Sequence, residues 1–265
     1  MVYPGVVARV LAHGEPRVAR GRKTLDVGFT TIKLDTPFDA LPTGTGRRAN
    51  LAIAAVEALQ LIGGFSNPAL MLKITQRFAE FMDGDHFHGA YGSRIKTQAV
   101  EVVNKLRRDE GSRQAVITLW DAHLDNLPGK RDYPCTVMLQ FEVHDAKLCM
   151  NVVMRSNDIW LGLPYDLFQF TQLQMSLARS LGLAYGWYRH TVLSLHLYEE
   201  DVEKCSAIRV PLDPHVIFQP QGVGHEKEDF PTIMKTARRL AAGRHAEDET
   251  MSEGWYADVL ASYVG

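Results

Sequence analysis

The sequence has little that would indicate a secreted or nucleic-acid-binding protein. It contains three cysteines among 265 residues, at positions 135, 149 and 205, and none of them forms a CxxC pair. This small, odd number excludes a disulfide framework and leaves free thiols. The 29 basic and 31 acidic residues give a formal charge of -2, so the chain as a whole does not attract polyanions or acidic membranes. We therefore expect a small partner, bound by a local cluster of charges.

Long hydrophobic runs are also missing. Pro4, Gly5, Arg9 and His13 interrupt the apolar N-terminal stretch, which disfavours a signal peptide or a membrane span and predicts a cytoplasmic protein. The basic run RVARGRK lacks interleaved aromatic residues, while His86 and His88 lie in a polar segment without a supporting cysteine. We therefore predict no nucleic-acid or membrane partner and no bound metal.

Helical and strand patterns alternate irregularly along the chain. Two apolar stretches predict buried helices, Leu51–Ile62 and Phe168–Leu183, the second ending at Gly182. Short runs rich in β-branched and aromatic residues predict strands at Ala115–Trp120, Thr136–Val143, Leu148–Met154 and Thr191–Tyr198. We found no internal repeat and no low-complexity linker. The sequence thus predicts one α+β domain over residues 1–265, with a mixed sheet packed by helices.

Cys135 is the candidate nucleophile. It lies between the turn-rich segment Asn126–Asp132 and a predicted strand. Free cysteines are more often small buried hydrophobic residues, which is our expectation for Cys149 and Cys205. Around Cys135, however, Lys130, Arg131 and Arg155 are expected to lower the thiol pKa, and a thiolate is the form that attacks carbon.

Two segments carry a specific resemblance. The tripeptide Tyr133–Pro134–Cys135, together with RSNDIWLGLPYD at Arg155–Asp166, resembles the thymidylate synthase family, whose hallmark is a proline-cysteine motif followed by QRSxDxxLGLPFN. Further similar segments follow the family's order, namely VEALQLIGGFSN, HGAYG, SRQAVITLW and LSLHLY. The resemblance spans roughly residues 20 to 200 and implies the fold and activity of that family.

The resemblance implies catalytic roles for four residues. Cys135 would add to C6 of the pyrimidine of a nucleoside monophosphate, and Glu57, the one carboxylate on an apolar helix, would order water around N3 and C4. Tyr91 would aid proton removal at C5, and Asp166 would face the base. The one-carbon donor implied by the family is 5,10-methylenetetrahydrofolate.

The resemblance also implies binding roles. For the folate, these fall on Asp158, Phe78 and Gly162. For the nucleotide, Arg155, Ser156 and either Arg20 or Arg22 would bind the phosphate, and His196 with Tyr198 would hold the sugar. Arg113 would reach the phosphate in the other subunit's site, in a homodimer formed through the sheet.

One departure from the family concerns the base. Asp166 replaces the family's asparagine, whose amide can accept from uracil N3–H and donate to O4, whereas an ionised carboxylate only accepts. Cytosine presents an N4 amino donor and, when protonated, an N3 donor. The change is similar to that in deoxycytidylate hydroxymethylases and predicts CMP or dCMP as substrate. In the alternative interpretation, Asp166 is only a helix N-cap before Leu167.

A second departure concerns the product. The segment ITQRFAEFMDGDHFHGAYG lacks the tryptophan that shields the methylene intermediate in the synthases, so water is expected to quench it and give a 5-hydroxymethyl group. Thr136, Met154 and Gln114 also replace the usual histidine, glutamine and arginine. We therefore predict a (deoxy)cytidylate 5-hydroxymethylase. Two alternatives remain open: C5 methylation of dUMP or UMP, and a catalytically silent relative that binds nucleotides or RNA.

Overall fold

The computed structural model describes residues 2–37, 40, 47, 49–208, 235, 237–239, 242, 255, 256, 258 and 259. Its strands are β1 (Glu15–Ala19), β2 (Arg22–Asp26), β3 (Thr30–Leu34), β4 (Val116–Thr118), β5 (Thr136–His144), β6 (Lys147–Met154), β7 (Asn157–Asp158), β8 (Ala184–Val192) and β9 (Leu195–Tyr198). Its helices are α1 (Tyr3–His13), α2 (Leu51–Gly63), α3 (Pro68–Ile74), α4 (Tyr91–Arg108), α5 (Leu163–Leu181) and α6 (Val202–Ser206), with short 3-10 turns η2 (Gln76–Phe81) and η3 (Glu199–Asp201).

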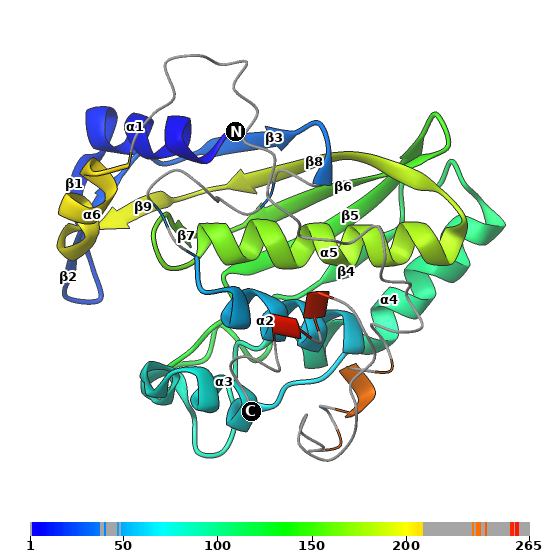
Figure 1. Ribbon diagram of the computed structural model, residues 1–265, viewed down its shortest axis with the longest axis horizontal. Coiled ribbons are helices and arrows are strands. Elements are labelled where there is room, and N and C mark those ends of the chain that lie inside the picture. The colour runs from blue at the N-terminus through cyan, green and yellow to red at the C-terminus, as the bar shows by residue number, and fades with distance from the viewer. Residues whose placement is uncertain are drawn as a thin grey trace.

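The larger sheet has five strands in the order β3-β8-β6-β5-β4. The β6–β8 pair is parallel and the other pairs are antiparallel. Helix α5 runs along one face of this sheet, and α2 lies on the far side of α5 (Figure 1). The predicted α+β class with a mixed sheet is therefore confirmed.

Helix α5 is the central element. Its residues are buried from Leu163 to Ala178, because the sheet covers one side and α2 with α4 cover the other. Pro164 suits the first turn, where an amide donor is not needed, and Gly182 ends the helix in the left-handed conformation with φ 71°. The predicted helix and its end at Gly182 are confirmed, although α5 begins five residues earlier than expected.

Helix α2 matches its predicted bounds to within one residue. The Asn50 side chain caps it by accepting from Ala52 N at 3.0 Å and Ile53 N at 3.2 Å. Tyr165 Oη on α5 accepts from Asn50 N at 2.9 Å. This bond fixes the start of α2 against the start of α5.

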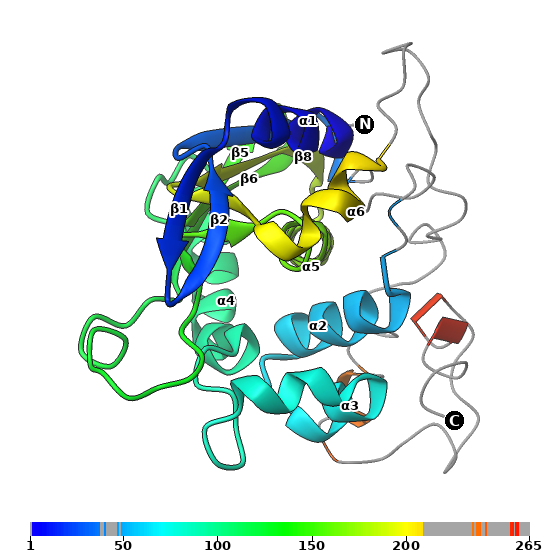
Figure 2. The same cartoon turned by 90° about the vertical axis from the view of Figure 1, so that its left-hand side faces the viewer.

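The smaller sheet has the order β1-β2-β9-β7. Its β1–β2 hairpin turns through Arg20 and Gly21, both with positive φ (51° and 74°), as a tight two-residue turn requires. In Figure 2 the hairpin stands beside the long loop that precedes β5. At the other end of the smaller sheet, Tyr3 Oη on α1 donates to Ile159 O at 3.0 Å and attaches α1 next to β7.

One strand prediction was wrong. Thr191–Tyr198 is not a single strand: β8 ends at Val192, the chain turns at Leu193 and Ser194, and β9 joins the smaller sheet. Ser194 Oγ donates to Asp26 Oδ2 at 2.7 Å, which draws the chain away from β8. The run contains no glycine or proline to signal this break.

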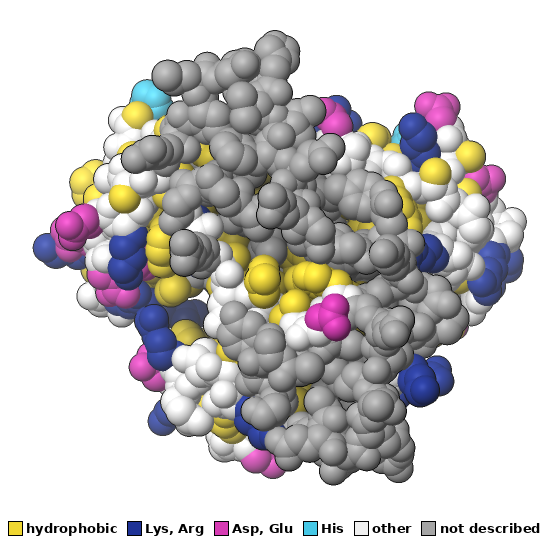
Figure 3. Space-filling view, in the orientation of Figure 1, with side chains coloured by type: hydrophobic (Ala, Val, Ile, Leu, Met, Phe, Trp, Pro, Cys, Tyr) yellow, Lys and Arg dark blue, Asp and Glu magenta, His cyan; other side chains and the backbone are white. Residues whose placement is uncertain are grey.

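On the face seen in Figure 3, hydrophobic side chains gather near the centre, and most of the basic and acidic side chains lie toward the margin. In the part of the chain that the structure describes, no helix is both long enough and apolar enough to span a membrane.

Candidate active site

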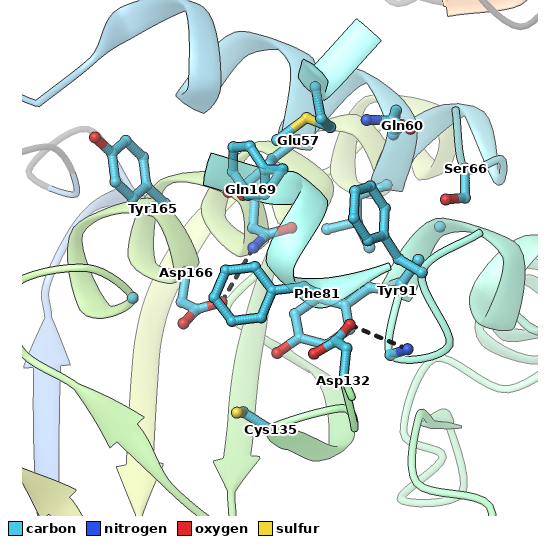
Figure 4. A pocket seen from close by; sticks show the side chains of 18 of the residues that line it. Glu57, Gln60, Ser66, Phe81, Tyr91, Asp132, Cys135, Tyr165, Asp166 and Gln169 are labelled. Atoms are coloured by element: carbon cyan, nitrogen blue, oxygen red, sulfur yellow. Dashed lines mark hydrogen bonds between the residues drawn. The ribbon is translucent and has the colours of Figure 1, made fainter. Parts of the chain in front are cut away.

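A cavity of about 270 Å³ lies between α2, α5, the start of α4, η2 and the segment leading into β5. Figure 4 shows Glu57, Tyr91, Cys135 and Asp166 around it. The structure thus brings together six of the residues expected in the site from sequence: Cys135, Glu57, Tyr91, Asp166, Phe78 and Gly162. They come from positions more than 100 residues apart.

Cys135 immediately precedes β5, as predicted. Arg155 Nη2 lies 3.8 Å from its sulfur. Burial nevertheless raises the pKa of the Cys135 thiol to about 11, and Arg155 and Arg20 oppose this rise only in part. The expectation of a lowered pKa is therefore wrong for the ligand-free chain. Lys130 and Arg131 are exposed, so they do not offset the loss of water around the sulfur.

The carboxyl groups of Glu57 and Asp166 both line this cavity. Burial raises the pKa of Glu57 to about 8, with a further contribution from the charge of Asp166. Burial likewise raises the pKa of Asp166 to about 7, and Asp158 adds to that rise. Two acids in a dry site cannot both ionise cheaply, so near neutral pH each can hold or release a proton.

Asp166 lies inside the first turn of α5. The N-cap position belongs to Gly162, with Leu163 as the first helical residue. The alternative in which Asp166 serves as the N-cap is therefore wrong. Its carboxylate instead accepts hydrogen bonds from Asn157 Nδ2 at 2.6 Å and Gln169 Nε2 at 3.0 Å. The side chain is 7% exposed and lines the cavity.

Tyr91 begins α4 and stacks on Phe170 of α5, with ring centroids 5.6 Å apart. Burial raises the pKa of Tyr91 well above its ordinary value. Its hydroxyl therefore keeps its proton at neutral pH and can both donate and accept hydrogen bonds in the cavity.

Three of the four predicted phosphate arginines lie near the cysteine loop or the smaller sheet, outside the cavity wall. Arg155 Nε donates to Pro134 O at 3.0 Å, which holds its guanidinium beside the sulfur. Arg20, at the hairpin tip, lies over the Tyr133 ring at 5.8 Å. Arg22 stacks on Tyr198 at 3.5 Å and pairs with Glu200 at 2.7 Å. The fourth, Arg113, is exposed just before β4.

Ser156, predicted to bind the phosphate, lies outside the cavity wall next to the predicted sugar-binding residues His196 and Tyr198. Ser156 Oγ is 3.4 Å from His196 Nδ1, and the rings of His196 and Tyr198 meet edge to face with centroids 5.1 Å apart. Asp158 is buried behind Gly162, where Oδ1 accepts from Leu161 N and burial raises its pKa.

Part of the cavity wall is apolar. It consists of the aromatic residues Phe78, Phe81 and Phe87 together with Leu161, and Phe81 is 44% exposed. Such a lining fits the flat ring of a pterin. His86 and His88 have separate partners, Asp85 at 3.1 Å and Asp125 at 2.7 Å. Among the described residues, no cluster of three or more His, Cys, Asp or Glu side chains could hold a metal ion.

The cavity wall also contains polar residues that the sequence did not indicate, among them Asp132 and Gln169. Asp132 accepts from Gly89 N at 3.1 Å, and burial raises its pKa. Gln169 donates to Asp166 from within α5 (Figure 4). The sequence did not single out Gln169, because α5 also carries Gln172 and Gln174.

Comparison with known proteins adds independent information. The chain is 26% identical to a deoxyuridylate hydroxymethyltransferase of Bacillus phage SP01, over 95% of this chain and 70% of that protein. It is 31% identical to a protein of the same name from Pseudomonas phage M6, over 68% of this chain and 53% of that protein. A third protein of this name, from Delftia phage PhiW-14, is 27% identical over 75% of this chain and 59% of that protein. The chain thus spans between about half and seven tenths of the length of these relatives.

The sequence profile described as Thymidylate synthase matches residues 1–215. Those residues include both sheets, the whole of α2, α4 and α5, and every side chain placed around the cavity above. With Cys135, Glu57, Tyr91 and Asp166 gathered in one cavity, profile and geometry agree, and the chain belongs to the thymidylate synthase family.

Proposed function

We propose that this chain transfers a one-carbon unit from 5,10-methylenetetrahydrofolate to C5 of a cytidine monophosphate, CMP or dCMP, and that water completes the reaction to give the 5-hydroxymethyl nucleotide. The observation that carries this proposal is that a cysteine sulfur and a buried aspartate, where the family has asparagine, line one cavity. The proposal treats residues 1–265 as a single catalytic domain working in the cytoplasm.

Cys135 is the nucleophile in this proposal. A lone pair of its sulfur forms a bond to C6 of the cytosine. The π electrons of the C5=C6 bond then form a C4=C5 bond, and those of the C4=N3 bond move onto N3. Atoms and charge balance when the thiol proton ends on N3. Arg155, 3.8 Å from the sulfur, stabilises the thiolate during this step. The step turns C5 into a nucleophilic carbon.

Asp166 faces N3 and N4 of the cytosine. Its pKa of about 7 suits a group that passes a proton to N3 near neutral pH. Glu57, with a pKa of about 8, holds water next to it. Tyr91 keeps its hydroxyl proton and orders the water that accepts the C5 proton.

The folate supplies the one-carbon unit as an electrophile. Phe78 and Gly162 line the cavity where its pterin ring would lie. Asp158 is assigned to the pterin through the family resemblance alone, since it lies behind Gly162 with its Oδ2 buried. Because the Phe81 side chain in the cavity wall is 44% exposed, water can reach the methylene group, which supports a hydroxymethyl product.

The nucleotide's phosphate and sugar are assigned to the region next to Cys135. We assign the phosphate to Arg155, Ser156 and Arg20. Arg20 is favoured over Arg22 because Arg22 already pairs with Glu200 at 2.7 Å. His196 and Tyr198 would hold the sugar.

The proposal includes a homodimer. Helix α5 covers one face of the five-stranded sheet, and the other face carries Gln140, Asn151 and Arg189 in one row across β5, β6 and β8. Pairing of two copies through that face would let Arg113 reach the partner's phosphate.

A uracil nucleotide is the second candidate substrate. The three relatives are named deoxyuridylate hydroxymethyltransferases. In addition, a protonated Asp166 could donate to uracil O4 as an asparagine does. Hydroxymethylation of a uracil nucleotide would differ from the proposal only in the base. Methylation of dUMP or UMP would differ also in the folate product, which would be dihydrofolate.

The deciding experiment incubates the protein with methylenetetrahydrofolate and each of CMP, dCMP, UMP and dUMP, and identifies the products by mass. We expect a 5-hydroxymethylcytidylate and no absorbance rise from dihydrofolate. If the product were a 5-hydroxymethyluracil nucleotide, the substrate would be UMP or dUMP and not CMP or dCMP. An absorbance rise from dihydrofolate would indicate methylation. No product and no release of tritium from C5 of any nucleotide would leave only the catalytically silent relative.

A further inference from the structure

Two amide side chains hold the carboxylate of Asp166 from two directions. Asn157 Nδ2, from β7, donates to Oδ2 at 2.6 Å, and Gln169 Nε2, one turn further along α5, donates to Oδ1 at 3.0 Å. Asn157 is 3% exposed and Gln169 is 6% exposed. We call this pair, Asn157 and Gln169, the amide clamp.

Asn157 contributes to the clamp through its amide nitrogen alone. Its Oδ1 is buried and has no hydrogen-bond partner among the described residues. Leaving a buried carbonyl unpaired is unfavourable, so the bond to Asp166 has to offset that loss. Among the described residues, the Asn157 side chain thus makes its hydrogen bond to Asp166.

Gly162 provides the space for the clamp. A Cβ at this position would lie 3.1 Å from Asn157 Nδ2 and 3.4 Å from Asp166 Oδ2. A larger residue would push the amide and the carboxylate apart. The space for the clamp is therefore set by the residue at the N-cap of α5.

Amide NH2 groups can only donate. Each Asp166 oxygen therefore acts as an acceptor toward the protein and keeps a lone pair for the cavity. The clamp stabilises the anion, whereas burial and the neighbouring acids favour the protonated form. The titratable groups around Asp166 from the other elements are Glu57 of α2, Tyr91 of α4, Cys135 before β5, Asp158 of β7 and Tyr188 of β8.

We propose that Asn157 and Gln169 are positioning residues that determine base specificity, because they fix both oxygens of Asp166 as acceptors facing the base. This inference rests on the proposed function in one respect, that Asp166 meets the pyrimidine. Cytosine N3 is basic enough to take a proton from a carboxyl held in this way, and uracil O4 is not. The clamp thus favours cytosine over uracil.

Removal of one clamp amide should raise the pKa of Asp166. The carboxylate loses a hydrogen-bond donor, and a hydrogen bond to a charged group corresponds to about one to two pKa units. A cytidylate complex holds one proton shared between Asp166 and N3, so binding weakens about tenfold per pH unit above the pKa of Asp166. The pH midpoint of binding should therefore move upward by about one to two units. The preference for cytosine over uracil should fall about tenfold.

The test measures the dissociation constants of CMP and UMP by calorimetry between pH 6 and 9.5. It compares the wild type with Gln169→Leu and Asn157→Leu, and repeats Gln169→Leu in an Asp166→Asn background. Gln174→Leu is the matched control, because it removes another buried amide of α5 that bonds to Leu148 O at 2.8 Å and not to Asp166. Thermal melting checks that each variant folds.

We expect the upward midpoint shift and the lower base ratio in both single clamp variants. In the Asp166→Asn background, Gln169→Leu should leave the pH profile unchanged, and Gln174→Leu should change only the melting temperature. If either folded clamp variant kept the wild-type midpoint and base ratio, the inference would be overturned. A wild type that binds uracil nucleotides best would overturn the cytosine proposal instead, and the midpoint shift could then be measured with UMP.

Discussion

At the base end of the candidate site, Asp166 is 7% exposed and its neighbours Glu57 and Tyr91 have pKa values raised by burial. At the phosphate end, the Arg22 side chain is 42% exposed, and Arg22 and Arg20 both lie over tyrosine rings. At the buried end, a single proton should strongly change which base binds, because burial strengthens each electrostatic interaction. In the wet end, each cation adds binding in a graded way. The four predictions below test this contrast, beginning with the largest expected effect.

Cys135→Ser should lower product formation by at least about 10³-fold, because a serine hydroxyl is a far weaker nucleophile without a base to activate it. Nucleotide binding should change little. Mass spectrometry of the products, and of the intact protein with a 5-fluoropyrimidine nucleotide, checks both points. Cys205→Ser, a change at a buried cysteine outside the cavity wall, is the control. A covalent adduct in Cys135→Ser would contradict the assignment.

Asp166→Asn should shift the ratio of kcat/KM for CMP over UMP toward uracil by about 10²-fold, because the amide can donate to O4 and no longer carries charge. Steady-state kinetics with both nucleotides measure the ratio. The contrast between the two ends predicts that added salt will not alter this shift. An unchanged ratio would show that Asp166 does not select the base.

At the phosphate end, Arg20→Ala should raise the KM for the nucleotide by about tenfold to a hundredfold, the loss expected for one hydrogen bond to a charged group. Arg22→Ala, the matched variant, should raise it by less than about threefold, because its guanidinium is engaged by Glu200. The Arg20 effect should shrink in high salt. Equal effects of the two variants would mean that both arginines bind phosphate.

Glu57→Gln should alter stability in addition to the catalytic role proposed for Glu57. The folded protein binds a proton at Glu57 up to about pH 8, and the unfolded chain releases it near pH 4.5. The stabilising contribution of that protonated state is complete below pH 4.5 and is lost as the pH rises to about 8.

Thermal melting at pH 5 and pH 8 measures this effect. The variant should melt within about 3 °C of the wild type at pH 5 and about 10 °C higher at pH 8. Glu101→Gln, on the exposed side of α4, provides the control and should melt like the wild type at both pH values. A difference in melting temperature between the variant and the wild type that is the same at pH 5 and pH 8 would rule out a raised pKa for Glu57.

The sequence predicted the buried elements better than the exposed ones. The bounds of α2 and the position of β5 and β6 follow from apolar patterns, since burial on one or both faces imposes a period. The helix α4 and the hairpin β1–β2 were not predicted: α4 begins with YGSRIK, and β1 is exposed along its whole length. Such segments owe their form to tertiary contacts, which a local pattern does not report.

The site shows the same division. Motif resemblance located Cys135, Glu57, Tyr91 and Asp166, which the fold brings into one cavity. It did not give the thiol pKa, because burial of the sulfur depends on residues far along the chain. Nor did it reveal Asn157 and Gln169 as partners of Asp166, because a pair of amides has no fixed spacing to a carboxylate.

The bond from Tyr3 to Ile159 sets an order of assembly. It joins positions 156 residues apart, so the first helix leaves the ribosome long before its acceptor is made. Such a distant closure is slow compared with local helix formation. The segment bearing Asn157 and Asp158 can therefore settle only when the earliest part of the chain returns to it. A nascent chain stalled before residue 157 would hold Cys135 without the residues that aim the base at it.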